Sequence, residues 1–98
     1  MGRVDGKTAL VTGAAHGIGR TAARMLAEEG AAVALTDVDA EAGAEAAADI
    51  RAEGGEAAFY EHDVTAEDDW TRVVTAVHDA MGGPTVLVNN AGIIDQDG

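Results

Sequence analysis

Short apolar runs alternate along this chain with longer segments in which apolar residues recur at helical spacing. The apolar runs lie at residues 8–12, 31–36, 57–60 and 86–88. Glycine, proline, aspartate or asparagine stands close to both ends of each run. Because the runs are too apolar to alternate between a buried and a solvent-facing side, we expect strands that are covered on both faces of a sheet.

The segments between these runs are expected to be helices, at residues 17–29, 40–53 and 66–81. In the first, apolar residues recur from Ile18 to Leu26 while Arg20 and Arg24 take another face, and Gly30 follows as a helix-ending residue. Asp39 can cap the second helix through its carboxylate. These segments therefore carry both the periodicity and the end signals of helices.

The third helix is expected to open at Thr65, which begins a stretch with the spacing of a capping box. Its inward-facing residues are expected to be Trp70, Val73, Val74 and Val77. The glycines at 82 and 83 and the proline at 84 then end it. Strands and helices are thus expected to alternate along the whole chain.

The order β-α-β-α-β-α-β predicts an α/β fold, a Rossmann-type doubly wound parallel sheet. Right-handed crossovers place the first strand centrally and give the strand order 3-2-1-4. A ligand crevice is expected where that order reverses, beyond the carboxyl ends of the strands. We expect residues 1–98 to form part of one such domain.

Charge and composition exclude several classes of protein. The 98 residues hold 18 acidic and 6 basic side chains, a formal net charge of -12. This balance argues against nucleic acid and against an anionic membrane surface as partners. Cysteine is absent, and the chain contains neither an apolar run of transmembrane length nor the apolar stretch of a signal peptide. We therefore expect a cytoplasmic protein without disulfides or a metal site.

Glycines mark the junction between the first strand and the first helix. Gly13 permits a tight turn, Gly17 allows backbone to approach a ligand without a Cβ in the way, and Gly19 lets the helix lie close to the sheet. The helix N-terminus then faces the ligand with its N–H groups and the positive end of its dipole. The pattern favours a dinucleotide pyrophosphate site over a simple glycine turn.

Asp37 ends the second strand, 18 residues after Gly19. At this distance a carboxylate can accept hydrogen bonds from the adenosine ribose and repel a 2′-phosphate. The next residues, Val38 and Asp39, offer no positive charge to offset that repulsion, so the sequence predicts NAD as the cofactor. His16 could touch a 2′-phosphate, but an exposed loop histidine is the favoured interpretation.

Asp63 and Val64 follow the third strand on the same edge of the sheet. There, the Asp63 carboxylate could accept from the adenine amino group while the following backbone provides a second contact. An aspartate after a strand is also a common cap or turn residue. Both interpretations stay open on these residues alone.

The segments Thr12-Gly-x-x-x-Gly-x-Gly19, Asp37, Asp63-Val64 and Asn89-Asn-Ala-Gly92 together resemble the short-chain dehydrogenase/reductase family. The resemblance implies an NAD-dependent oxidoreductase that moves hydride between the nicotinamide and a secondary alcohol or ketone, commonly as a homo-oligomer. The opening residues and the Asp63 to Trp70 stretch look like members that oxidise cyclic alcohols, including bacterial hydroxysteroid and cyclopentanol dehydrogenases. The cofactor-binding residues that it implies are Gly13, His16, Gly17, Ile18, Gly19, Asp37, Asp63, Val64, Asn90, Ala91 and Gly92.

The catalytic Ser and Tyr-x-x-x-Lys of that family lie downstream of Asn-Asn-Ala-Gly. Tyr60 is followed four residues later by Val64 rather than Lys, so it does not match that motif. We therefore expect a domain truncated after the fourth strand, with no catalytic residue and no activity by itself. A non-catalytic NAD-binding or regulatory module is the alternative. A methyltransferase is disfavoured by the glycine spacing and by Asn89 to Gly92.

Overall fold

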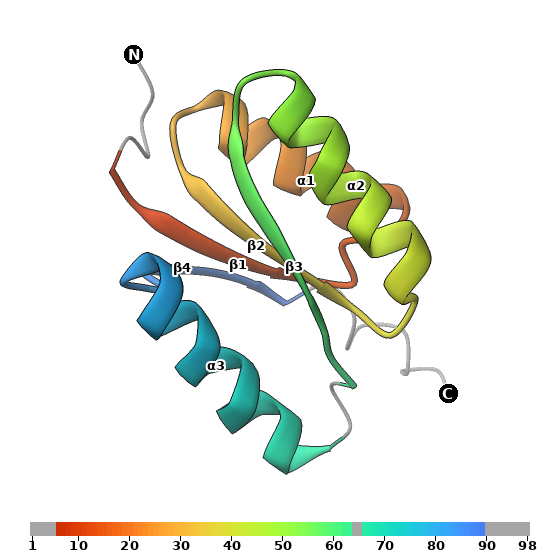
Figure 1. Cartoon of the computed structure of the whole chain (residues 1–98), viewed down its shortest axis with the longest axis vertical. Helices are drawn as coiled ribbons and strands as arrows, with labels where there is room; N and C mark the ends of the chain where they lie inside the picture. The colour runs from red at the N-terminus through yellow and green to blue at the C-terminus, as the bar shows by residue number, and fades with distance from the viewer. Residues whose placement is uncertain (1–5, 64–65, 90–98) are drawn as a thin grey trace.

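The computed structural model describes residues 6–63 and 66–89 and confirms the alternating order (Figure 1). Its elements are β1 (Thr8–Thr12), α1 (Gly17–Glu28), β2 (Ala32–Asp37), α2 (Ala40–Ala52), β3 (Glu56–Glu61), α3 (Glu67–Met81) and β4 (Val86–Asn89). The boundaries differ from those expected by at most one residue. Within the described residues, no helix is long and apolar enough to cross a membrane.

The strands form one parallel sheet in the order β3-β2-β1-β4, as the crossovers predict. Thr12 at the end of β1 is paired in register with both Thr36 of β2 and Asn89 of β4. Asp37 is paired in turn with Glu61 of β3. The strands therefore end side by side along one edge of the sheet, which we call the carboxyl rim.

Helices cover both faces of the sheet. α1 and α2 lie on one face and α3 lies on the other (Figure 1). Alanine, valine and leucine side chains fill the first interface, and Leu10, Ala34, Val73 and Val77 form the second. Coverage on both faces explains why β1 and β2 show no apolar-polar alternation. For β4 the expectation was wrong, because its side chains alternate in burial and Leu87 is 56% exposed.

Small residues set how closely the helices approach the sheet. In α1 the buried residues are Gly19 and Ala23, whereas Ile18 and Met25 are 78% and 56% exposed. In α2, Gly43 lies against the ring of Phe59, and a Cβ on that glycine would overlap the ring. Among the large apolar residues of α1, Leu26 packs against the core of this face, whereas Ile18 and Met25 do not lie on the buried side.

Two expectations for α3 were wrong. Val74 is 38% exposed, because only Val73 and Val77 of the expected valines lie on the buried face. The N-cap is Ala66, which makes no side-chain cap, so the helix starts one residue later than a cap at Thr65 would require. Thr65 itself lies outside the described residues. By contrast, Gly82 ends the helix in a left-handed conformation, as expected.

Candidate functional site

The carboxyl rim gathers the polar residues that follow each strand. The loop between β1 and α1 begins at Gly13, and β2 ends at Asp37. His62 and Asp63 follow β3, and Asn89 ends β4. The strand order reverses between β1 and β4, which is where ligands of doubly wound sheets bind. The topology therefore brings the described members of the expected site to one edge.

The glycine loop has the backbone conformation that the sequence predicts. Gly13 and Gly17 have φ angles of +63° and +56°, in the left-handed region that L side chains rarely adopt. A Cβ on Gly17 would meet no atom within 4 Å, so the chain leaves space beside this position. Gly19 is buried in the first turn of α1, and Ile18 beside it is largely exposed.

The N-terminus of α1 differs from those of the other two helices. Its N-cap His16 makes no side-chain cap, and its first turn carries no acidic residue. α2 is capped by Asp39 and has Glu41 in its first turn, while the first turn of α3 holds three acids. The first N–H groups of a helix have no partner within the helix. The α1 terminus therefore keeps its positive end available for an anion.

Asp37 is held at the rim by backbone donors. Its Oδ2 accepts from the N–H of Ala15 at 3.0 Å, and its Oδ1 accepts from the N–H of Asp39 at 3.0 Å. Each carboxylate oxygen can accept more than one hydrogen bond, so hydroxyl donors can still be bound. The carboxylate is thus fixed next to the glycine loop.

His16 is exposed, as expected, and its partner is Asp39. Its Nε2 lies 2.9 Å from Asp39 Oδ2, while Oδ1 of the same carboxylate caps α2 through the N–H of Ala42. The hydrogen bond from His16, followed by that from Ala42, lowers the pKa of Asp39 below 3.8. Asp39 is therefore a second carboxylate on the rim that the sequence reasoning treated only as a cap. Its position two residues after Asp37 was the available signal.

Side chains of α3 secure the segment after β3. The N–H of Asp63 donates to Asp69 Oδ2 at 2.9 Å, and this bond is the main cause that lowers the pKa of Asp69. Arg72 contacts Asp69 and donates to the carbonyl of Glu61 at 2.6 Å. Asp63 is exposed at the rim, with its backbone position fixed by these contacts.

Buried polar residues at the rim make contacts that the sequence did not predict. Thr12 donates to Val88 O or Asn89 Oδ1, at 3.4 and 3.1 Å, and so joins the ends of β1 and β4. His62 is buried beneath α3 beside Thr36. Burial lowers the pKa of His62 below its usual 6.5, with Arg72 acting in the same direction and Asp69 and Asp63 opposing.

Some expected residues cannot be placed. Val64, Asn90, Ala91 and Gly92 lie outside the described residues. Within the described ranges, no group of three or more His, Asp or Glu residues is arranged to bind a metal.

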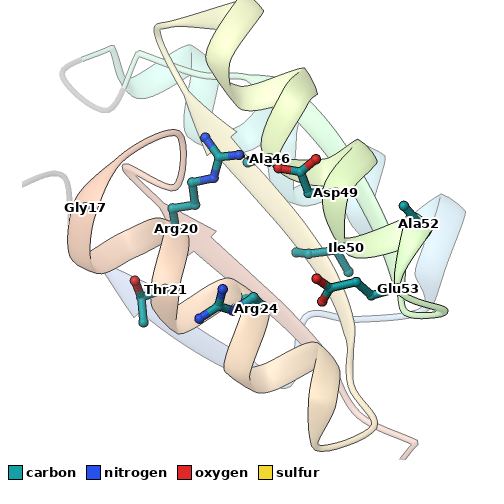
Figure 2. Close-up of a pocket in the computed structure, with 9 residues that line it drawn as sticks. All are labelled: Gly17, Arg20, Thr21, Arg24, Ala46, Asp49, Ile50, Ala52 and Glu53. Atoms are coloured by element: carbon teal, nitrogen blue, oxygen red, sulfur yellow. Dashed lines mark hydrogen bonds and ion pairs between the residues drawn. The ribbon is translucent and has the colours of Figure 1, made fainter.

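A hollow also lies between α1 and α2, away from the expected set except at Gly17 (Figure 2). The side chains of Arg20 and Asp49 point toward each other across it, and their ion pair measures 2.6 Å. Arg24 and Glu53 line it further along. The Arg20–Asp49 ion pair thus joins the two helices.

Comparison with known proteins places these observations in a family. The family model described as short chain dehydrogenase matches residues 7–98. The chain is 47% identical over 92 residues to 3-beta-hydroxysteroid dehydrogenase of Comamonas testosteroni, covering 94% of this chain and 35% of that protein.

It is also 48% identical over 94 residues to cyclopentanol dehydrogenase of a Comamonas species, covering 96% of this chain and 38% of that protein. A crystal structure of hydroxysteroid dehydrogenase from Escherichia coli superposes with a TM-score of 0.87 at 35% identity, covering 90% of this chain and 37% of that one. The chain thus spans little more than a third of the length of these relatives.

Proposed function

The chain belongs to the short-chain dehydrogenase family, and we propose on that basis that it forms the NAD-binding part of an oxidoreductase that acts on a secondary alcohol or ketone. The observation that carries the proposal is the position of the Asp37 carboxylate, hydrogen-bonded to the Ala15 N–H of the glycine loop. One edge of the sheet thereby offers a fixed negative charge beside a helix N-terminus that its own side chains leave uncapped.

The glycine loop and the carboxylates at this edge suit, respectively, the pyrophosphate and the adenosine of an adenosine diphosphate group. The backbone of Gly17 and the first turn of α1 would receive the pyrophosphate, since positive φ and open space allow close approach there. The Asp37 carboxylate would accept from the ribose hydroxyls. Asp63 would contact the adenine, with its backbone held by Asp69.

The charges at the rim favour NAD over NADP. A 2′-phosphate on the ribose would approach Asp37 and also Asp39, whose backbone N–H is bonded to the Asp37 carboxylate. The nearest imidazole, that of His16, is engaged with Asp39. Two carboxylates thus oppose the added phosphate, and the described residues at this point include no lysine or arginine beside them.

Bound NAD supplies the nicotinamide ring that accepts or donates hydride, and the protein orients it. Ile18 is the exposed apolar residue at the start of α1 and would cover the nicotinamide side of the site. Tyr60 is partly buried against the cluster beneath α3, and the fourth residue after it is Val64 rather than the Lys of the family motif. Proton transfer is therefore assigned to residues outside the described part of the chain.

The substrate class that we propose is a cyclic secondary alcohol or the corresponding ketone. Hydroxysteroid and cyclopentanol dehydrogenases are the names of similar proteins, and both names indicate a hydroxyl group on a ring. Continuing the reading frame past residue 98 tests the enzymatic part of the proposal. A Ser followed by Tyr-x-x-x-Lys supports an enzyme, whereas a stop codon there would favour a non-catalytic NAD-binding module.

Cofactor binding is tested by titrating NAD and NADP separately into the full chain in a calorimeter. We expect NAD to bind more tightly than NADP. Asp37→Asn keeps the shape of the side chain but removes its charge, so it should weaken NAD about ten- to a hundredfold and reduce the discrimination against NADP. Glu45→Gln, an equal charge change on the exposed face of α2, is the matched control. An unchanged preference in Asp37→Asn would refute the assignment.

A further inference from the structure

His62 is a buried polar residue for which the NAD site described so far has no role. It is 1% exposed and follows β3, one residue before Asp63. Its Nδ1 lies 3.1 Å from Thr36 Oγ1, and its ring meets that of Trp70 edge-on, with centroids 4.6 Å apart. Its Nε2 is buried and meets no hydrogen-bond partner among the described residues. Buried polar atoms without partners are uncommon in proteins.

The hydrogen bonds around Thr36 define which nitrogen of His62 carries the proton. The hydroxyl of Thr36 faces the carbonyl oxygen of Val11 at 3.4 Å, and a carbonyl can only accept. A hydroxyl has a single proton; we assign it to the Val11 carbonyl, so that Thr36 accepts from His62 Nδ1. Burial lowers the pKa of the ring and so favours its neutral form, which then carries its proton on Nδ1 and a lone pair on Nε2.

His62 is joined to β2 twice. Its backbone N–H donates to the carbonyl of Asp37 at 3.0 Å, and its side chain bonds Thr36, the residue before Asp37. Through the chain it is also joined directly to Asp63. His62 thus connects Asp37, which is assigned to the ribose, with Asp63, which is assigned to the adenine.

We propose that His62, in its neutral Nδ1–H form, is a positioning residue for the adenosine half of the cofactor site. By bonding Thr36 and packing on Trp70, it sets where Asp37 and Asp63 lie relative to each other. Cofactor affinity then falls when the ring takes up a second proton. This inference rests on the proposal that the carboxyl rim binds NAD.

The surroundings of the ring explain why a second proton would disturb it. An Nε2–H would be a buried charged donor with no acceptor, which is costly. Of the charged groups around the ring, Asp69 and Arg72 belong to α3, Asp63 follows β3, and Asp37 ends β2. Asp69 is engaged with Arg72 and with the N–H of Asp63, and the Asp37 carboxylate is engaged with Ala15 and Asp39. The protonated ring would therefore have to leave its place, and Asp63 would move with it.

Trp70 provides a direct readout, because it is the single tryptophan of the chain and contacts the His62 ring. Indole fluorescence depends on the group in contact with the ring, so displacement of the imidazole should change the emission of Trp70. Trp70 emission and the dissociation constant for NAD are to be measured between about pH 8 and pH 5.5, within the range where histidine titrates. In the wild type, we expect the emission to change and the affinity to fall with the same midpoint, below pH 6.5.

Two substitutions separate positioning from simple filling of space. In His62→Asn, the amide nitrogen lies close to the place of Nδ1 and can still donate to Thr36. This variant should bind NAD within about threefold of the wild type at pH 8 but lose the joint change in emission and affinity on acidification. His62→Leu fills the space without a donor and should weaken NAD about tenfold at pH 8.

Thr36→Ser and Thr36→Val repeat the comparison from the other partner, and they decide the question if His62→Leu does not fold. The serine variant should keep NAD affinity, whereas the valine variant should lose about tenfold. The inference is overturned if His62→Asn keeps the wild-type pH profile, or if a folded His62→Leu or Thr36→Val binds NAD as the wild type does. A wild type that binds no NAD at any pH would instead overturn the proposed function, and the inference with it.

Discussion

The N–H of Ala15 donates to the carboxylate of Asp37 across 3.0 Å, although 22 residues separate them along the chain. The residue assigned to the ribose therefore also holds the loop assigned to the pyrophosphate. A substitution at Asp37 acts on both at once, so its effects on cofactor choice and on folding have to be measured separately.

Asp37→Asn should lower the free energy of unfolding by about 1–2 kcal/mol, because an amide has one acceptor oxygen for the two backbone donors that the carboxylate satisfies. Urea denaturation of the ligand-free chain measures this change. Asp37→Glu keeps the charge but moves it one methylene outward, and is the comparison for charge alone. Equal stability of wild type and Asp37→Asn would mean that these two bonds contribute nothing to the folded state.

Asp39 has two functions that one pair of substitutions can separate. Asp39→Ser keeps a side-chain oxygen for the cap of α2 but removes the charge and the contact with His16. We expect the serine variant to unfold near the wild-type urea midpoint and to reject NADP less strongly. Asp39→Ala should lower that midpoint, because the cap is lost as well.

The effects of Asp39→Ser and Asp37→Asn on NADP affinity should add in a double variant. NADP should therefore bind the double variant more tightly than either single variant. Calorimetric titration of the two single variants and the double variant is the measurement. If Asp39→Ser leaves NADP binding unchanged in both backgrounds, Asp39 does not take part in cofactor choice.

Gly43→Ala should destabilise the chain by about 1–3 kcal/mol, because the added Cβ would overlap the ring of Phe59. Alanine is otherwise favoured over glycine in a helix by about 1 kcal/mol, so a net loss reports the overlap. Phe59→Leu makes room, and the double variant should lose less stability than the two single changes added together. Strict additivity in urea denaturation would contradict the predicted contact.

The free energy of unfolding should fall as the pH drops below about 6.5. Burial lowers the pKa of His62 in the folded chain, so between the two pKa values the unfolded chain binds more protons and is favoured. The stability is complete above the unfolded value of 6.5 and is lost as the pH falls through the folded value. His62→Asn should flatten this part of the profile, measured by urea denaturation at several pH values.

In more acidic solutions, carboxylates also contribute to the pH dependence of the free energy of unfolding. The contact with His16 holds the pKa of Asp39 below 3.8, and the N–H of Asp63 does the same for Asp69. Their stabilising effect is present above that value and is lost as the pH falls through the lowered values. A second decline in stability, separate from that of His62, is therefore expected in strongly acidic buffer.

Much of the fold could be predicted from local pattern and chirality. Apolar runs such as residues 31–36 indicated strands covered on both faces, and right-handed crossovers then left the order β3-β2-β1-β4. The positive φ angles of Gly13 and Gly17 agree with the roles assigned to those glycines. These features depend on neighbouring residues and on general rules of chain connection.

The missed parts of the site depend on contacts between distant segments. His62 resembles any polar residue after a strand, and its burial arises only because Trp70 of α3 covers it. Likewise, the contact of His16 with Asp39 spans 23 residues and requires the loop after β1 to meet the start of α2. Neither relationship produces a periodic signal in the sequence.

The buried face of α1 has a consequence for how this chain tolerates change. Gly19 and Ala23 occupy that face, while Ile18 and Met25 point outward. At Gly19 and Ala23, what restricts substitution is therefore an upper limit on size rather than a need for hydrophobicity. An enlarging change at Ala23 should be harmful even when it is apolar, and a polar change at Met25 should be accepted. A library built on hydrophobicity alone would protect Ile18 and Met25 and overlook Gly19.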